Sequence, residues 1–226
     1  MNQQVKTLAS LLLAGDTEEA WKLVLTEYQD GKTSLQLYEE LFTRAMQYIG
    51  ELWETDDISV ADEHLATTTC DYLLSRYAYL LKKRSYFVNN DEKIKRNAMF
   101  FCLQDEQHYL GLKMASLVFE ERGWETQLHG ANLPLEDAIQ TAEEAKPEVI
   151  LLSFTLLYHA EKLSSYVREL EALPHKPAIV VGGRLLPKYD FRKYCSENTK
   201  LLSSLSDLDS WIAAEFGHGV KMDVND

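Results

Sequence analysis

The chain has 226 residues, 46% hydrophobic and 26% charged, an ordinary composition for a globular protein of one or two domains. Its formal net charge of −13 disfavours direct nucleic-acid binding, because an acidic chain gains little by releasing counterions from phosphates. No apolar run approaches the roughly 18 residues of a membrane span, and no signal peptide is recognisable at the start. The three cysteines (Cys70, Cys102 and Cys195) are far apart and predict reduced thiols, so we expect a cytoplasmic protein.

The first 87 residues carry four segments in which apolar residues recur at helical spacing. Gly15 and Gly31 separate the first three segments, and Ser59 is the expected N-cap of the fourth. The predicted helices cover residues 2–14, 16–31, 34–53 and 59–84. Because short connections join them, we predict a four-helix bundle over residues 1–87.

Residues 88–96 are polar and are predicted to be a linker, after which strand and helix patterns alternate through a second domain, residues 97–226. The predicted strands are 97–103, 124–129, 148–154, 177–182 and 200–204. The predicted helices are 109–122, 134–145, 159–172 and 206–216, with a short element near 187–193. Five strands alternating with helices indicate a Rossmann-like (flavodoxin-like) parallel sheet, so the fold class is α/β with an all-α amino-terminal domain.

One histidine, His108, falls in the loop after the first predicted strand, at the sheet edge where open α/β folds bind ligands. Glu106 could accept a hydrogen bond from one ring nitrogen and so prepare the imidazole to bind a metal. Gly111 would let a bulky ligand approach the backbone. Taken alone, a loop histidine beside a carboxylate is more often a surface polar pair, because single motif matches are weakly specific.

Two later strand ends carry related features, a serine after one strand and a glycine pair after another. The full set is Glu106, His108, Gly111, Ser153, Thr155, Gly182 and Gly183. This pattern resembles the cobalamin-binding domain family. The resemblance implies that His108 replaces the cofactor's own dimethylbenzimidazole as the lower axial cobalt ligand. It also implies that the displaced nucleotide tail passes the serine and the glycines. Glu106 stands where the commoner pattern has Asp, and Thr155 where it often has Leu.

A second constellation lies in the predicted bundle, where Glu63 and His64 follow Trp53 after nine residues. Without the downstream domain, Trp53 would be interpreted as core and the pair as surface residues of a helix. Ahead of a cobalamin-binding domain, this spacing is similar to that of the CarH/LitR-type light sensors. That resemblance implies that adenosylcobalamin binds, that Trp53 packs over the adenosyl group, and that Glu63 and His64 help enclose it.

Two departures from the light sensors bear on function. Those regulators normally begin with a basic helix-turn-helix DNA-binding domain, which this sequence lacks. The residue after their tryptophan is a histidine that takes the upper cobalt position after photolysis, whereas here it is Glu54. A stable adduct through position 54 is therefore not expected.

These observations together favour a stand-alone adenosylcobalamin light sensor, not an enzyme, which forms a homo-oligomer and signals through an unidentified protein partner. One alternative is a corrinoid carrier for methyl transfer, and another is a sensory module that holds a bilin or haem. Of the remaining histidines, His129 and His159 are placed near predicted strand ends, within reach of a cofactor's rim. His175 and His218 are expected in solvent.

Overall fold

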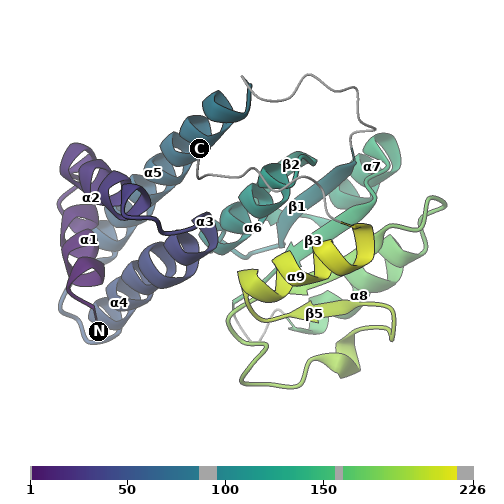
Figure 1. Ribbon diagram of the computed structural model, residues 1–226. Coiled ribbons are helices and arrows are strands. Elements are labelled where there is room, and N and C mark those ends of the chain that lie inside the picture. Colours follow the sequence, from purple (N-terminus) through teal and green to yellow (C-terminus); the bar gives the residue numbers. More distant parts are fainter. Residues whose placement is uncertain (1, 87–95, 156–159, 218–226) are drawn as a thin grey trace. The chain divides into compact units, whose positions relative to one another are not determined.

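The computed structural model describes residues 2–86, 96–155 and 160–217 (Figure 1). These residues divide into two units, and the boundary between the units lies between residues 86 and 96 of the sequence. Most of the predicted linker, together with His159 and His218, lies outside the described residues. None of the helices within the described ranges is long and apolar enough to cross a membrane.

The amino-terminal unit is helical, as predicted. Its elements are α1 (Gln3–Leu13), α2 (Thr17–Gln29), α3 (Ser34–Gln36), a π-helical segment (Leu37–Phe42), α4 (Thr43–Glu54) and α5 (Val60–Tyr86). The elements from α3 to α4 follow one another without a gap, so the helix predicted over 34–53 is confirmed. Its π-helical middle was not predicted, because the spacing of apolar residues does not distinguish one wide turn from an α-helical one.

Tyr77 of α5 joins the helices of this unit. Its buried ring meets Tyr28 of α2 and Tyr38 of the π-helical segment edge to face, with centroids 5.6 and 5.9 Å apart. Its hydroxyl lies 2.9 Å from the Oγ of Ser34, which satisfies the polar end of a buried aromatic side chain. The last helix of the unit is therefore fixed to the middle ones by both packing and a hydrogen bond.

The second unit is a five-stranded parallel sheet of order β2-β1-β3-β4-β5, which confirms the predicted fold class. The strands are β1 (Asn97–Leu103), β2 (Glu125–Leu133), β3 (Val149–Ser153), β4 (Ala178–Gly182) and β5 (Lys200–Leu202). The helices are α6 (Leu110–Glu121), α7 (Leu135–Ala145), α8 (Ala160–Glu171) and α9 (Leu205–Phe216). The short element predicted near 187–193 is a 3₁₀ turn, Arg192–Tyr194.

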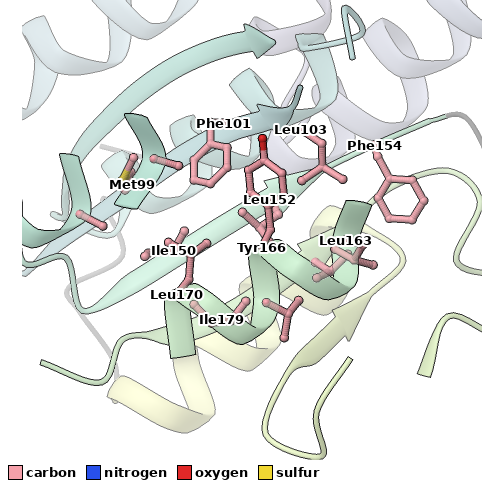
Figure 2. Packing of buried hydrophobic residues seen from close by; sticks show 14 of the residues in the cluster. Met99, Phe101, Leu103, Ile150, Leu152, Phe154, Leu163, Tyr166, Leu170 and Ile179 are labelled. Carbon is pink, nitrogen blue, oxygen red and sulfur yellow. The ribbon is translucent and has the colours of Figure 1, made fainter. Parts of the chain in front are cut away.

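Alternate residues of β1 face opposite layers of helices, as a pleated strand requires. Phe100 packs edge to face on Phe119 of α6, with ring centroids 5.1 Å apart. Phe101 lies 6.0 Å from Tyr166 of α8, within the buried cluster drawn in Figure 2. Both faces of the central strand are thus covered, which explains why its sequence is apolar without interruption.

β2 is longer than predicted, because it continues to Leu133 rather than ending at residue 129. Gly130 and Asn132, residue types typical of turns, are accommodated by an irregular register opposite Phe101 and by positive φ, 74° and 56°. His129 therefore lies within an edge strand, and its predicted place at a strand end is wrong. The extra length carries Asn132 to the loop after β1.

Candidate functional site

The strand order places a topological switch point at β1, whose neighbours are β2 on one side and β3 on the other. Ligands of open parallel sheets bind at such a point, beyond the carboxyl ends of the strands. The register confirms that the predicted residues share this edge: Cys102 of β1 is opposite Ser153, and Ser153 is opposite Gly182. Gly183 follows Gly182 directly and Thr155 lies two residues after Ser153, so the three separated motifs come together in one region.

The loop after β1 is held by main-chain hydrogen bonds. Glu106 N–H donates to Leu103 O at 3.0 Å, which closes a tight turn through Asp105, whose φ is 70°. Asn132 at the end of β2 binds this turn twice: its Oδ1 accepts from Asp105 N–H at 2.7 Å, and its N–H donates to Glu106 O at 2.9 Å. The backbone that carries Glu106 and His108 is thereby fixed to the neighbouring strand.

Helix α8 reaches the same loop. The Tyr166 hydroxyl donates to Leu133 O at 2.6 Å and accepts from Gln104 N–H at 3.3 Å. Burial raises the pKa of Tyr166, so the phenol remains a donor at neutral pH. An ion pair between Lys162 and Asp105 adds a second contact from α8.

His108 and Glu106 form the predicted pair. The Glu106 carboxylate is fully buried, and its Oε1 lies 2.6 Å from His108 Nδ1 and accepts the His108 main-chain N–H at 2.9 Å. Its Oε2 accepts from the main-chain N–H and the hydroxyl of Thr155, at 2.6 and 2.9 Å. The Thr155 hydroxyl is also 2.9 Å from His108 Nδ1. Both carboxylate oxygens are therefore engaged, each by a different loop.

The hydrogen bonds and charge of this cluster fix the tautomer of the His108 imidazole. Burial by itself raises the pKa of Glu106, but the hydrogen bonds from His108 and Thr155 outweigh it and bring the pKa to about 2. An ionised carboxylate can only accept hydrogen bonds, so a neutral His108 carries its proton on Nδ1. The nitrogen with a lone pair to offer a metal is then Nε2, and the His108 side chain is 54% exposed.

Cys102 is the nearest thiol, yet its environment keeps it protonated. Burial, and then the negative charge of Glu106, raise the pKa of Cys102 well above its usual range. Its Sγ lies 3.7 Å from His108 O. A protonated thiol is a poor metal ligand, which leaves the imidazole as the better donor here.

The glycines differ in what surrounds them. A Cβ atom on Gly111 would meet nothing within 4 Å, and one on Gly182 would make an ordinary contact of 3.7 Å with Leu151. A Cβ on Gly183 would lie 2.4 Å from Phe154 O, a distance no real side chain adopts. Gly183 is thus required by the protein's own backbone, whereas Gly111 is exposed and a side chain there would meet no other described residue.

The second constellation, which consists of Trp53, Glu63 and His64, lies where α4 ends and α5 begins. Asp57 N–H bonds to Leu52 O at 2.9 Å, and Ser59 N–H and Oγ both donate to Asp62 Oδ2, so the connection is short and capped as predicted. Trp53, in the last turn of α4, is 49% exposed, which argues against a packed core role.

Glu63 and His64 begin the next helix. Glu63 accepts a hydrogen bond from Thr67 Oγ at 2.9 Å, while the His64 side chain is 74% exposed and its Nε2 is 3.7 Å from Glu63 Oε2. Glu54, which follows Trp53, is also exposed. Of the other histidines, His175 was expected in solvent but has a buried Nε2 with no hydrogen-bond partner among the described residues.

Two segments of the chain match family models, and both models are described as a B12 binding domain: residues 4–77 and residues 96–197. The chain is a B12-binding domain protein. Its helical unit and its Rossmann-like unit each match a B12 binding domain model, so the cofactor that the chain binds is a cobalamin.

Individual relatives of this B12-binding domain protein are distant. The HTH-type transcriptional repressor CarH of Myxococcus xanthus is 27% identical over 161 residues, 71% of this chain and 51% of that protein. The chain thus spans about half the length of this curated relative.

Solved structures of low identity share the fold. The monomethylamine corrinoid protein of Methanosarcina barkeri has a TM-score of 0.69 at 15% identity, covering 95% of this chain and 99% of its own. The methanol:cobalamin methyltransferase complex MtaBC from the same organism has a TM-score of 0.50 at 13% identity, covering 97% of this chain and 81% of its own. A cobalamin-binding protein from Desulfitobacterium hafniense has a TM-score of 0.50 at 14% identity, covering 93% and 97%.

The described residues fit a corrinoid better than a bare metal ion. A bare ion needs several protein ligands, and no cluster of three or more His, Cys, Asp or Glu side chains that could hold one occurs within the described ranges. A corrin ring brings its own equatorial nitrogens, so one imidazole suffices. His108, whose side chain is 54% exposed, would supply it.

Sequence reasoning missed two residues of this site, Asn132 and Tyr166, and one contact of Thr155. Asn132 was placed beyond a strand that in fact continues, and Tyr166 gave no signal because a tyrosine on an amphipathic helix is ordinarily core. Thr155 was noticed only for its place near the nucleotide tail. Its contact with Glu106 depends on the pairing of β1 with β3, which brings the residues after these two strands together.

Proposed function

We propose that this protein is an adenosylcobalamin-dependent light sensor that signals through a change in its own assembly or in the binding of a protein partner. The observation that carries the proposal is Trp53, a tryptophan half exposed at the end of α4, with Glu63 and His64 at the start of the next helix. A packed structural tryptophan would be buried, whereas one that stacks on an adenine must keep a face accessible.

Each unit has a separate task in this proposal. His108, held by Glu106, would supply Nε2 to the cobalt, and Gly111, which carries no side chain, would leave the backbone beside it accessible. Trp53 stacks on the adenosyl group, and Glu63 accepts hydrogen bonds from its hydroxyl or amino groups. When bound, adenosylcobalamin would supply a cobalt–carbon bond that light breaks. Loss of the adenosyl group would remove the stacking partner of Trp53, and the helical unit would be the part that responds.

A corrinoid carrier for methyl transfer is the second candidate, and Glu54 favours it. A carboxylate is a harder ligand than imidazole and a weaker partner for Co(III), so the position after Trp53 lacks the donor that would hold a photolysed state. A carrier needs no such donor, because its upper face must be open to a methyltransferase. The two candidates differ in whether the adenosyl form is preferred and whether light has a structural effect.

Size-exclusion chromatography with light scattering tests the proposal. The protein is loaded with adenosylcobalamin in the dark, and elution is compared before and after green light, with photolysis followed by absorption. We expect a change in elution volume or mass, and the same measurement on a methylcobalamin-loaded sample should give a smaller change. Identical elution and scattering after complete photolysis would refute the sensor and leave the carrier.

A paired substitution tests the role of Trp53 directly. Trp53→Ala should weaken adenosylcobalamin binding several-fold, from a stacking contribution of roughly 0.5–1.5 kcal/mol, and should affect methylcobalamin much less. Tyr79→Ala removes an even more exposed aromatic of the same unit, 69% exposed, and is expected to leave both affinities unchanged. Equal losses for both cofactor forms would make Trp53 a general structural residue.

A further inference from the structure

We infer that the outward face of α5 is a docking surface for a second copy of this chain, and that two copies pair through antiparallel α5 helices. The inference concerns the cofactor-free chain in the dark, so it goes beyond the proposed function and does not depend on it. It rests on the spacing, exposure and charge of the residues along this one helix.

The outward face of α5 has the residue spacing of a helix that pairs with another helix. The inward side of α5 is core and packs against α1, α2 and α4. On the opposite side, exposed residues recur at alternating intervals of four and three, which is the heptad spacing of paired helices. This outward stripe consists of Ala61, Leu65, Thr68, Tyr72, Ser75 and Tyr79.

The outward stripe lacks the charged side chains that a solvent-facing helix normally carries. Between residues 60 and 81, all of which the structure describes, α5 has no exposed Asp, Glu, Lys or Arg. Its three large side chains, Leu65, Tyr72 and Tyr79, are 45%, 47% and 69% exposed. By contrast, α2 exposes two glutamates and a lysine along its length. A helix that is apolar all round is normally buried on both sides, so the outward stripe is expected to be covered.

The charges at the two ends of α5 favour a second copy in antiparallel orientation as the occupant. The first turn is acidic, with Asp62 and Glu63, and the carboxyl end is basic, with Lys82 and Lys83. Parallel α5 helices would place like charges side by side. Antiparallel helices set the acidic end of each copy against the basic end of the other.

The outward stripe is also suited to two-fold symmetry. Tyr72 lies midway between residues 61 and 83, so a two-fold axis beside it would bring Leu65 opposite the partner's Tyr79. The stripe is about 27 Å long at a rise of 1.5 Å per residue. A single helix pair of that length falls at the low end of specific interfaces, below about 1,200 Å² in total. We therefore expect a reversible dimer with a dissociation constant of roughly 1–100 µM.

Sedimentation velocity of the cofactor-free full chain in the dark, from about 1 to about 200 µM, measures this pairing. The wild type should shift from monomer to dimer as its concentration rises. Tyr72→Glu places like charges across the two-fold axis and should weaken association by at least about tenfold. Gln47→Glu is the matched control, because it adds the same charge at an exposed position of α4, and it should leave association unchanged. Circular dichroism checks that both variants fold.

Oxidative cross-linking tests the orientation of the two helices. Tyr72→Cys places a thiol beside its symmetry mate and should give a disulfide-linked dimer under mild oxidation. Tyr79→Cys should not, because the two copies of residue 79 would lie about 21 Å apart along the helix axis. The wild type, oxidised in the same way, controls for the three native cysteines.

Three results would overturn the inference: a monomer at every concentration, association that Tyr72→Glu leaves intact, or equal cross-linking through both positions. None of these results involves cobalamin or light, so the proposed function would stand or fall separately.

Discussion

Gly111 and Gly183 offer a sharp test of whether the space at this sheet edge is reserved for a ligand. Gly111 is the second residue of α6, and a Cβ there would meet nothing within 4 Å. Glycine within a helix costs roughly 0.5–1 kcal/mol relative to alanine. Gly111→Ala should therefore stabilise the cofactor-free protein by up to about 1 kcal/mol, a rise of about 2–4 °C in Tm for a chain of this size.

The same substitution should weaken cobalamin binding, because the added methyl group occupies space that the cofactor fills. Overpacking a well-filled site costs about 1–3 kcal/mol, so we expect an affinity loss of roughly 5- to 150-fold. Gly183→Ala is the contrasting variant: its Cβ would lie 2.4 Å from Phe154 O, so it should lower the Tm of the cofactor-free protein. Thermal unfolding without cofactor and titration with hydroxocobalamin measure both effects. Wild-type affinity in Gly111→Ala would refute the reasoning.

Three further predictions concern single side chains. Replacing His108 with alanine should greatly weaken cobalamin binding or return the bound cofactor to its base-on absorption spectrum, and an unchanged spectrum would contradict the ligand assignment. Trp53→Phe keeps a smaller aromatic face and should retain more adenosylcobalamin affinity than Trp53→Ala, as titrations in the dark would show. The folded pKa of Glu106 is about 2 against an ordinary 4.5, so its stabilisation is complete above about pH 4.5 and is lost as the pH falls through about 2. Urea unfolding of the cofactor-free protein should show a loss of at most about 3 kcal/mol from this group, absent in Glu106→Gln.

Much of the fold follows from local sequence patterns. The apolar run of β1 is buried on both faces by helices, and the helical spacing before residue 87 gives a helical unit. The carboxyl end of β2 could not be predicted from such patterns, because Gly130 and Asn132 are typical turn residues. They adopt positive φ inside an irregular edge strand instead, which pairs with β1 and bonds through Asn132 to the loop after it.

The candidate site was predicted less completely than the fold. The pair of Glu106 and His108 could be inferred because two residues of one loop interact locally. The contacts of Thr155 and Asn132 depend on which strands are neighbours and on their register, and the sequence pattern gives neither. Gly183 shows the converse. The sequence suggested that this glycine leaves space for a ligand, but a Cβ there would clash with the carbonyl oxygen of Phe154, so the protein's own backbone already requires a glycine.

The two constellations differ in how firmly the protein holds them, and for the proposed light sensor this difference predicts which residues respond to light. The loop carrying His108 is bound by Asn132 from β2, by Tyr166 from α8 and by Thr155 after β3. Trp53 and the start of α5 are exposed, and local contacts hold them.

A change in the adenosyl group should consequently alter the helical unit and leave the ligand loop in place, because segments with few buried contacts open at the lowest free energy. Hydrogen–deuterium exchange of the adenosylcobalamin-loaded protein, in the dark and after green light, should differ over residues 50–65. The amides of Asp105 and Glu106, which donate to Asn132 Oδ1 and Leu103 O, should remain equally protected in both states. Exchange that increases mainly over residues 104–110 would instead place the light response at the lower ligand and contradict this division.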